Sequence, residues 1–246
     1  MNWVEYFENN RANRIAIPWD VDIQTTPELR KALLASLQRF QVGESGEGHH
    51  LKASAARRGN PEYARAIALF IAEEQYHAEM LARLIGLLGG RLLEWHWSDA
   101  AFILLRRMMG LRVELMVLLI AEMIAKRDYR ALDEGTSSPA LNAVFRQIRN
   151  DEEKHIAFHV EFLAASFVRL PEMQRRIVKD IWRTFFSVVC AVVVWDHRSV
   201  LQATGVPLRS FMEDCFIIFA DVSAVIFLLD AGPAAALDSE FARQKR

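Results

Sequence analysis

Two short segments decide how this chain folds: Glu74-Gln-Tyr-His77 and Asn150-Asp-Glu-Glu-Lys-His155. Each holds a Glu followed three residues later by a His, and residues i and i+3 share one face of an α-helix. The two copies are 78 residues apart, and Glu44 and Glu122 are separated by the same 78 residues. The chain therefore repeats one unit, a helix with a single Glu followed by a helix with Glu-x-x-His.

Helix start signals outline the rest of the repeat. Thr26-Pro27-Glu28, Asn60-Pro61-Glu62 and Ser138-Pro139 each place a capping residue before a proline at the first helical position. We expect helices over about residues 27–58, 61–88, 98–134, 138–171, 172–203 and 207–231. No segment predicts a strand, and long helices joined by short connections form antiparallel pairs.

The predicted fold is therefore all-α, with a four-helix bundle as its core. We expect one domain over residues 1–246, with the bundle in 27–170, two additional helices in 171–232 and a flexible tail in 233–246.

Composition limits the classes of function. The chain is 52% hydrophobic and 25% charged, which supports a sizeable core, and its formal net charge of −1 gives no electrostatic case for nucleic-acid binding. Its two cysteines, Cys190 and Cys215, predict buried free thiols and a cytoplasmic protein. The apolar runs 185–195 and 215–229 are too short or too interrupted to predict a membrane span, and the first residues lack a signal-peptide pattern.

Six side chains of the repeat are candidate metal ligands: Glu44, Glu74, His77, Glu122, Glu152 and His155. Each Glu-x-x-His pair can bind one metal ion, and the two single glutamates on the facing helices can bridge or cap the pair. Four carboxylates balance the charge of two divalent cations, which makes burial of the centre tolerable. Oxygen and imidazole ligands suit iron or manganese, and the absence of cysteine ligands argues against structural zinc.

The same residues resemble the ferritin-like di-iron carboxylate superfamily, over about residues 27–170. The segment 150–155 looks like the acidic Glu-x-x-His segment common in its oxygen-activating branches. The resemblance implies a di-metal centre in a four-helix bundle. It implies activities that range from oxidation and oxygenation of organic substrates to radical generation in ribonucleotide reductase, iron storage and manganese catalase. It also implies that Asp151 orients His77 and that Glu73 orients His155.

Several neighbouring residues keep two interpretations. Glu47 shares a helix face with Glu44 and competes with it as a ligand. Glu114 is interpreted as a channel residue or a partnered polar residue, and His159 as a partnered core or surface histidine, although both remain candidates for metal contact. Glycines also crowd around Glu44, where they predict a kink, close helix packing or room for a substrate: Gly43, Gly46 and Gly48.

The leading functional hypothesis is an oxidase or oxygenase with two iron ions, or with Mn/Fe or Mn/Mn, that activates dioxygen to oxidise a small or medium organic molecule. Electrons are expected from an external donor, because the sequence has no Gly-x-Gly-x-x-Gly motif and no cysteine cluster. A homodimer is compatible with this hypothesis. The alternatives are a ferritin-like iron-binding or ferroxidase protein without organic substrate, a manganese catalase and a metal-free interaction protein.

Overall fold

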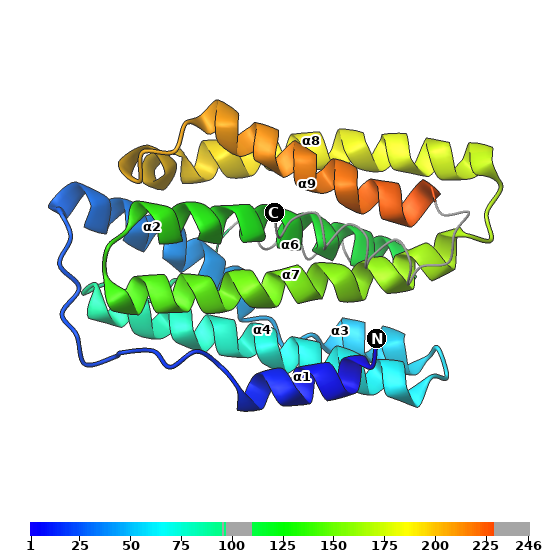
Figure 1. Ribbon diagram of the computed structural model, residues 1–246, viewed down its shortest axis with the longest axis horizontal. Coiled ribbons are helices and arrows are strands. Elements are labelled where there is room, and N and C mark those ends of the chain that lie inside the picture. The colour runs from blue at the N-terminus through cyan, green and yellow to red at the C-terminus, as the bar shows by residue number, and fades with distance from the viewer. Residues whose placement is uncertain (95, 97–109, 229–246) are drawn as a thin grey trace.

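The computed structural model describes residues 1–94, 96 and 110–228, and this part of the chain is helical and contains no strand. Figure 1 shows its elements in order. The helices are α1 (Trp3–Ala12), α2 (Pro27–Glu44), α3 (His49–Ala56), α4 (Pro61–Leu87), α6 (Gly110–Gly135), α7 (Pro139–Phe167), α8 (Glu172–Ala203) and α9 (Leu208–Leu228).

The predicted helix starts at residues 27, 61 and 139 are confirmed, and each has proline in its first turn. The Thr26 hydroxyl accepts a hydrogen bond from the Leu29 amide at 3.2 Å, and the Asn60 side chain accepts one from the Tyr63 amide at 3.0 Å. These bonds satisfy amides that have no partner within the first helical turn. The Ser138 side chain makes no such bond.

The single helix predicted over residues 27–58 is wrong. Helix α2 ends at Glu44 and α3 begins at His49, because Gly48 adopts a left-handed conformation with φ +62°. A β-carbon at Gly48 would lie 2.5 Å from the Ile71 side chain of α4, so glycine also permits a close approach of the two segments. Helix α1 was not predicted. The expected helix start at residue 98 and the expected tail at 233–246 lie outside the described residues.

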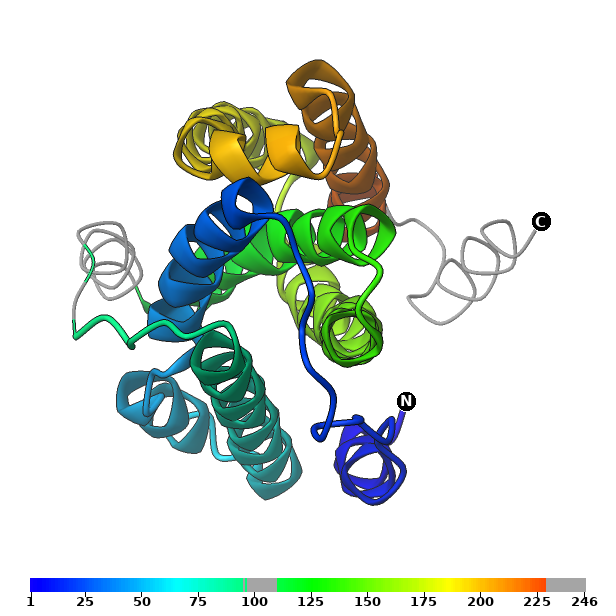
Figure 2. The ribbon, with the colours of Figure 1, turned by 90° about the vertical axis from the view of Figure 1, so that its left-hand side faces the viewer.

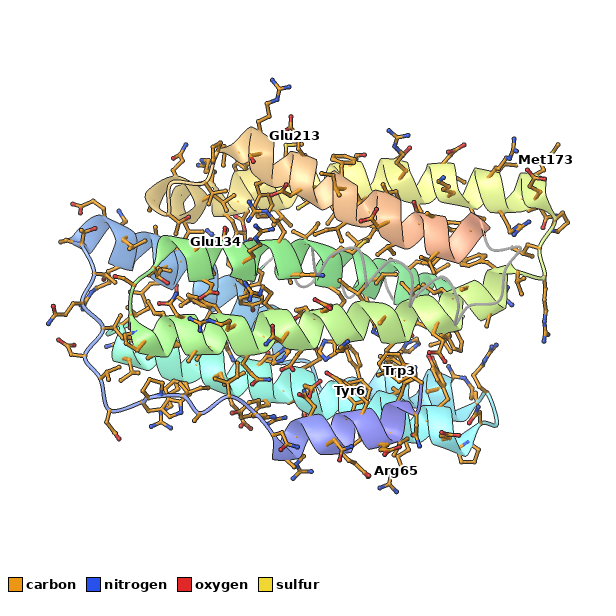
Figure 3. The ribbon with its side chains drawn as sticks, viewed as in Figure 1. Trp3, Tyr6, Arg65, Glu134, Met173 and Glu213 are labelled. Atoms are coloured by element: carbon orange, nitrogen blue, oxygen red, sulfur yellow. The ribbon has the colours of Figure 1, made fainter. Side chains whose placement is uncertain are left out.

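The helices pack as long neighbouring pairs, with α2 beside α4, α6 beside α7 and α8 beside α9. Helix α1 packs on α4, α8 packs against α2 and α6, and α9 packs against α6 and α7. Figures 1 and 2 show α8 and α9 on one side of the molecule and α1 on the other. In Figure 3, Trp3 projects from α1 toward α7, where its indole N–H donates to Glu161 at 2.9 Å.

Buried apolar side chains form two clusters along these helices. On α4, one cluster uses residues 66–71 and the other 80–85; on α7, the first uses 156–167 and the second 140–148. Both Glu-x-x-His segments therefore lie between two apolar layers, which hold the helices in place around them.

Two further expectations concern the cysteines and membrane-spanning helices. Cys190 and Cys215 are buried free thiols, as predicted. Among the described residues, we find no helix with both the length and the apolar character needed to cross a membrane.

Candidate metal centre

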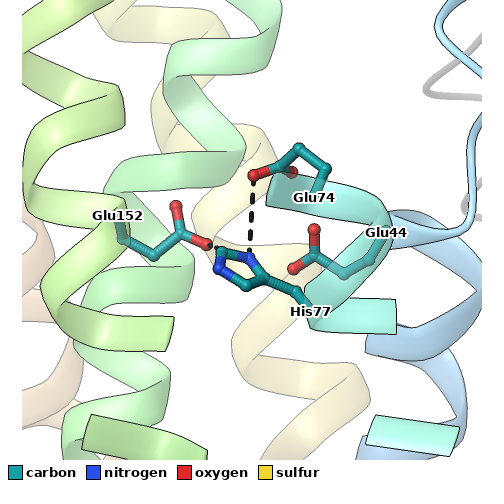
Figure 4. A group of neighbouring side chains, drawn as sticks. All are labelled: Glu44, Glu74, His77 and Glu152. Atoms are coloured by element: carbon teal, nitrogen blue, oxygen red, sulfur yellow. Dashed lines mark ion pairs between the residues drawn. The ribbon is translucent and has the colours of Figure 1, made fainter. Parts of the chain in front are cut away.

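The structure brings the six predicted ligand side chains together where α2, α4, α6 and α7 meet. They form two overlapping groups whose ligand atoms lie within 4.8 Å of one another: Glu44, Glu74, His77 and Glu152 in one, and Glu74, Glu122, Glu152 and His155 in the other. Figure 4 shows the first group. Glu74 and Glu152 belong to both groups and would be the ligands shared by two ions, whereas Glu44 and Glu122 each belong to one group.

The two imidazoles of the cluster are fully buried and turn Nδ1 toward carboxylates. The Nδ1 atom of His77 lies 3.7 Å from Glu74 and 3.8 Å from Glu152. The Nδ1 atom of His155 lies 2.9 Å from Glu74 and 3.4 Å from Glu122.

Within the described part of the chain, several of these buried atoms make no hydrogen bond: Nδ1 of both histidines, Oε1 of Glu74 and Oε2 of Glu152. Buried polar atoms in folded proteins are otherwise almost always partnered. A group of unpartnered oxygen and nitrogen donors around a common point is what a divalent cation requires, so the residues present fit a pair of metal ions.

The opposite ring nitrogens are held by carboxylates, as the resemblance implied. Nε2 of His77 is 3.0 Å from Asp151, and Nε2 of His155 is 3.0 Å from Glu73. Both carboxylates are buried. Such a contact fixes the ring orientation and the tautomer, so that Nδ1 is left free to bind a metal.

Asn10 of α1 joins these two carboxylates. Its amide nitrogen donates to Glu73 at 2.7 Å and to Asp151 at 2.8 Å, one bond for each of its two hydrogens. Gln147 donates to Asp151 as well, at 2.8 and 2.9 Å. Sequence reasoning missed both residues, because neither belongs to the repeat.

Electrostatics show that the carboxylates crowd one another in the protein alone. Burial and the neighbouring Glu74 raise the pKa of Glu44 well above its ordinary value, and burial and the nearby Glu122 do the same to the pKa of Glu152. Burial alone would raise the pKa of Glu122, but its contacts with Glu152 and His155 lower it to about 2. Burial would lower the pKa of His155, yet Glu74 and the other carboxylates raise it well above its usual range. Like charges in a buried site need protons or cations to coexist.

The remaining candidates lie outside the two ligand groups. Glu47 is exposed, so it does not replace Glu44. Glu114 is fully buried and both its oxygens lie 3.0 Å from Nδ1 of His50, which confirms a partnered polar residue. His159 is fully buried, but neither of its nitrogens makes a hydrogen bond to a described residue, so the expectation of a hydrogen-bonded histidine is wrong for this part of the chain.

A cavity of about 390 Å³ adjoins the cluster and is lined by four of its carboxylates, those of Glu44, Glu74, Glu122 and Glu152. Its walls are mainly apolar: Phe40, Leu51, Phe70, Ile71, Leu118, Ala121, Ile124, Ala125, Phe185, Val188, Val189, Val192 and Val193. The predicted glycines 43, 46 and 48 line it next to Glu44, as do Arg39 and His197. This volume lies within the range of about 300–1,000 Å³ usual for small-molecule sites.

No family model, curated protein or solved structure matches the chain. By its own geometry, the centre is a buried group of carboxylates and imidazoles in a helical protein, and it is compatible with two metal ions.

Proposed function

We propose that this protein is a di-metal carboxylate oxidase or oxygenase whose two ions, preferentially iron, activate dioxygen to oxidise a small or medium organic molecule. The observation that carries the proposal is the cavity, which is apolar along its walls and reaches four of the six ligand residues. An organic molecule in that cavity would lie directly beside the metal positions.

The ligand set supports two ions of charge +2. Glu44, Glu74, Glu122 and Glu152 supply four negative charges, and two neutral imidazoles complete the set. Oxygen and nitrogen donors of this kind suit iron and manganese. We interpret α2, α4, α6 and α7 as a ferritin-like four-helix bundle to which α8 and α9 are added, because the carboxylates and Glu-x-x-His pairs fall on these four helices.

The chain itself would perform two tasks. Asp151 and Glu73 orient the two histidines, so that the ligand atoms keep one geometry. The apolar walls of the cavity position the substrate. When bound, a reduced metal pair would supply electrons for the reduction of dioxygen, and the electrons that restore it would come from an external donor.

The alternative, iron oxidation without an organic substrate, needs no apolar cavity beside the metal ions. Residues Phe185, Val189 and Val193 of α8 form one wall of the cavity beside the carboxylates. This wall favours the oxidase or oxygenase over a protein that only stores or oxidises iron.

The test is metal analysis of protein purified without chelators, followed by oxygen exposure of the anaerobic, Fe(II)-loaded form in a stopped-flow spectrophotometer. We expect two ions per chain and a transient change in absorption. Glu152→Ala should abolish both, whereas Glu153→Ala should not, because Glu153 is a half-exposed neighbour that contacts Lys126 at 3.6 Å. Absence of any spectral change in the metal-loaded parent protein would refute the proposal.

A further inference from the structure

The lining of the cavity extends along α8, and His197 is the polar residue at one end of this stretch. Its α8 lining begins at Phe185 and ends at His197, twelve residues later, which corresponds to about 18 Å of helix at 1.5 Å per residue. The intervening lining residues of α8 are valines. At the His197 end, the centroids of the Phe40 and His197 rings lie 4.7 Å apart.

His197 is held so that one ring nitrogen remains for a ligand. Its Nδ1 atom lies 2.8 Å from the Ser36 hydroxyl, and Asp128 approaches the same nitrogen at 3.8 Å. Nε2 lies 3.9 Å from Asp196, which is beyond hydrogen-bond length. The imidazole is therefore anchored on one side and offers Nε2, as donor or acceptor, on the other.

Within the described lining, this polar end offers a ligand no free cation. Among the described residues that line the cavity, Arg39 and His197 are the ones that can be cationic. Arg39 is compensated by Asp196, whose carboxylate lies 3.2 Å from its Nε and whose backbone carbonyl accepts from it at 3.0 Å. Burial, with Arg39 as a second cause, lowers the pKa of His197 to about 3, so the ring is neutral at physiological pH.

The geometry points to a specific substrate class: we propose that the cavity binds an uncharged amphipathic molecule, an alkyl chain that ends in a hydroxyl or carbonyl group. The polar group contacts Nε2 of His197, and the chain runs along the α8 valines past the carboxylates of the metal centre. The assignment as substrate rests on the proposed oxidase or oxygenase function, whereas the binding preference does not require metal.

Charged analogues are disfavoured for two different reasons. In the metal-free cavity, a carboxylate end group would meet four glutamates at one place and only the already paired Arg39 at the other. In the metal-loaded cavity, where the glutamates are neutralised by the ions, an ammonium group would lose its hydration without gaining an anionic partner in the cavity lining.

Binding of 1-decanol, decanoate and decylammonium at pH 7 by calorimetry tests the proposal, with full-length protein in chelator-treated and metal-loaded forms. We expect 1-decanol to bind at least tenfold more tightly than decanoate in the chelator-treated form, and at least tenfold more tightly than decylammonium in the metal-loaded form. His197→Phe should weaken 1-decanol binding about five- to tenfold, as expected for loss of one hydrogen bond. His197→Gln keeps a neutral polar group and should retain most of the preference for 1-decanol. This second variant keeps the test available if His197→Phe does not fold.

Val189→Trp is the control for location, because a bulky residue on the cavity wall should block all three compounds. Tighter binding of decanoate than of 1-decanol in the chelator-treated form, or of decylammonium in the metal-loaded form, would overturn the proposal. So would unchanged 1-decanol binding in His197→Phe or in Val189→Trp. A failure of the oxygen reaction would leave these chelator-treated measurements intact, so the two proposals fail separately.

Discussion

Replacement of Asn10 by alanine tests whether α1 helps to build the candidate metal centre. Asn10 donates one hydrogen bond to Glu73 and one to Asp151, the carboxylates that hold the two histidines. A hydrogen bond to a charged group contributes about 1.5–3 kcal/mol. Because Asn10 is only half-buried, water would replace part of that contribution. We therefore expect Asn10→Ala to lower the free energy of unfolding by about 2 kcal/mol.

Asn10→Ala should also weaken metal binding, because the histidine rings would be less firmly oriented. Changes to such supporting residues typically lower metal affinity 10- to 100-fold. The assay is competition of Fe(II) or Mn(II) binding against a calibrated chelator, together with thermal unfolding with and without metal. Asn13→Ala is the matched control: it lies at the end of the same helix and loses one exposed hydrogen bond, to the Asn9 carbonyl at 2.8 Å. If Asn10→Ala binds metal as tightly as Asn13→Ala does, α1 has no part in the site and the reasoning fails.

Three further results are expected. Removal of metal by a chelator should lower the melting temperature, since an ion at about 1,000 times its Kd stabilises the folded state by about 4 kcal/mol; an unchanged melting curve would contradict metal binding. Gly48→Ala should destabilise the protein by about 1–3 kcal/mol in chemical denaturation, because its φ is +62° and the new methyl group would meet Ile71, whereas Gly86→Ala, with open space around it, should be neutral or stabilising. Burial raises the pKa of Asp128 to about 7, so its contribution to stability is complete below the ordinary aspartate pKa and is lost as the pH rises through 7. Asp128→Asn should therefore make stability fall less between pH 5 and pH 8, and an unchanged pH profile would show that Asp128 is not the cause.

The sequence predicted the parts of the fold that follow local rules. Helix starts at Pro27, Pro61 and Pro139 were predictable because proline and a preceding capping residue act within one turn. The convergence of Glu-x-x-His segments was predictable because the repeat brings equivalent helix faces together. The helix break after Glu44 was not predicted, since glycines in a helical pattern are compatible with a kink as well as with an end.

The contacts that sequence reasoning missed depend on tertiary structure. Asn10 reaches Asp151 across 141 positions of sequence, and Ser36 reaches His197 across 161. Neither pair has a periodic signal, because each is produced by packing of helices from different parts of the chain. The polar end of the cavity and the support of the histidines therefore could not be predicted from the sequence pattern, because both arise from tertiary packing.

The break after Glu44 also removes the equivalence of the two halves. Glu122 lies within a continuous helix and is almost completely buried, whereas its counterpart Glu44 is the last residue of α2, partly exposed and followed by a glycine-containing link. An ion held partly by Glu44 should exchange with solution faster than its neighbour. The centre would then fill in two steps of different rate, so that ions of two different elements could be installed in a defined order.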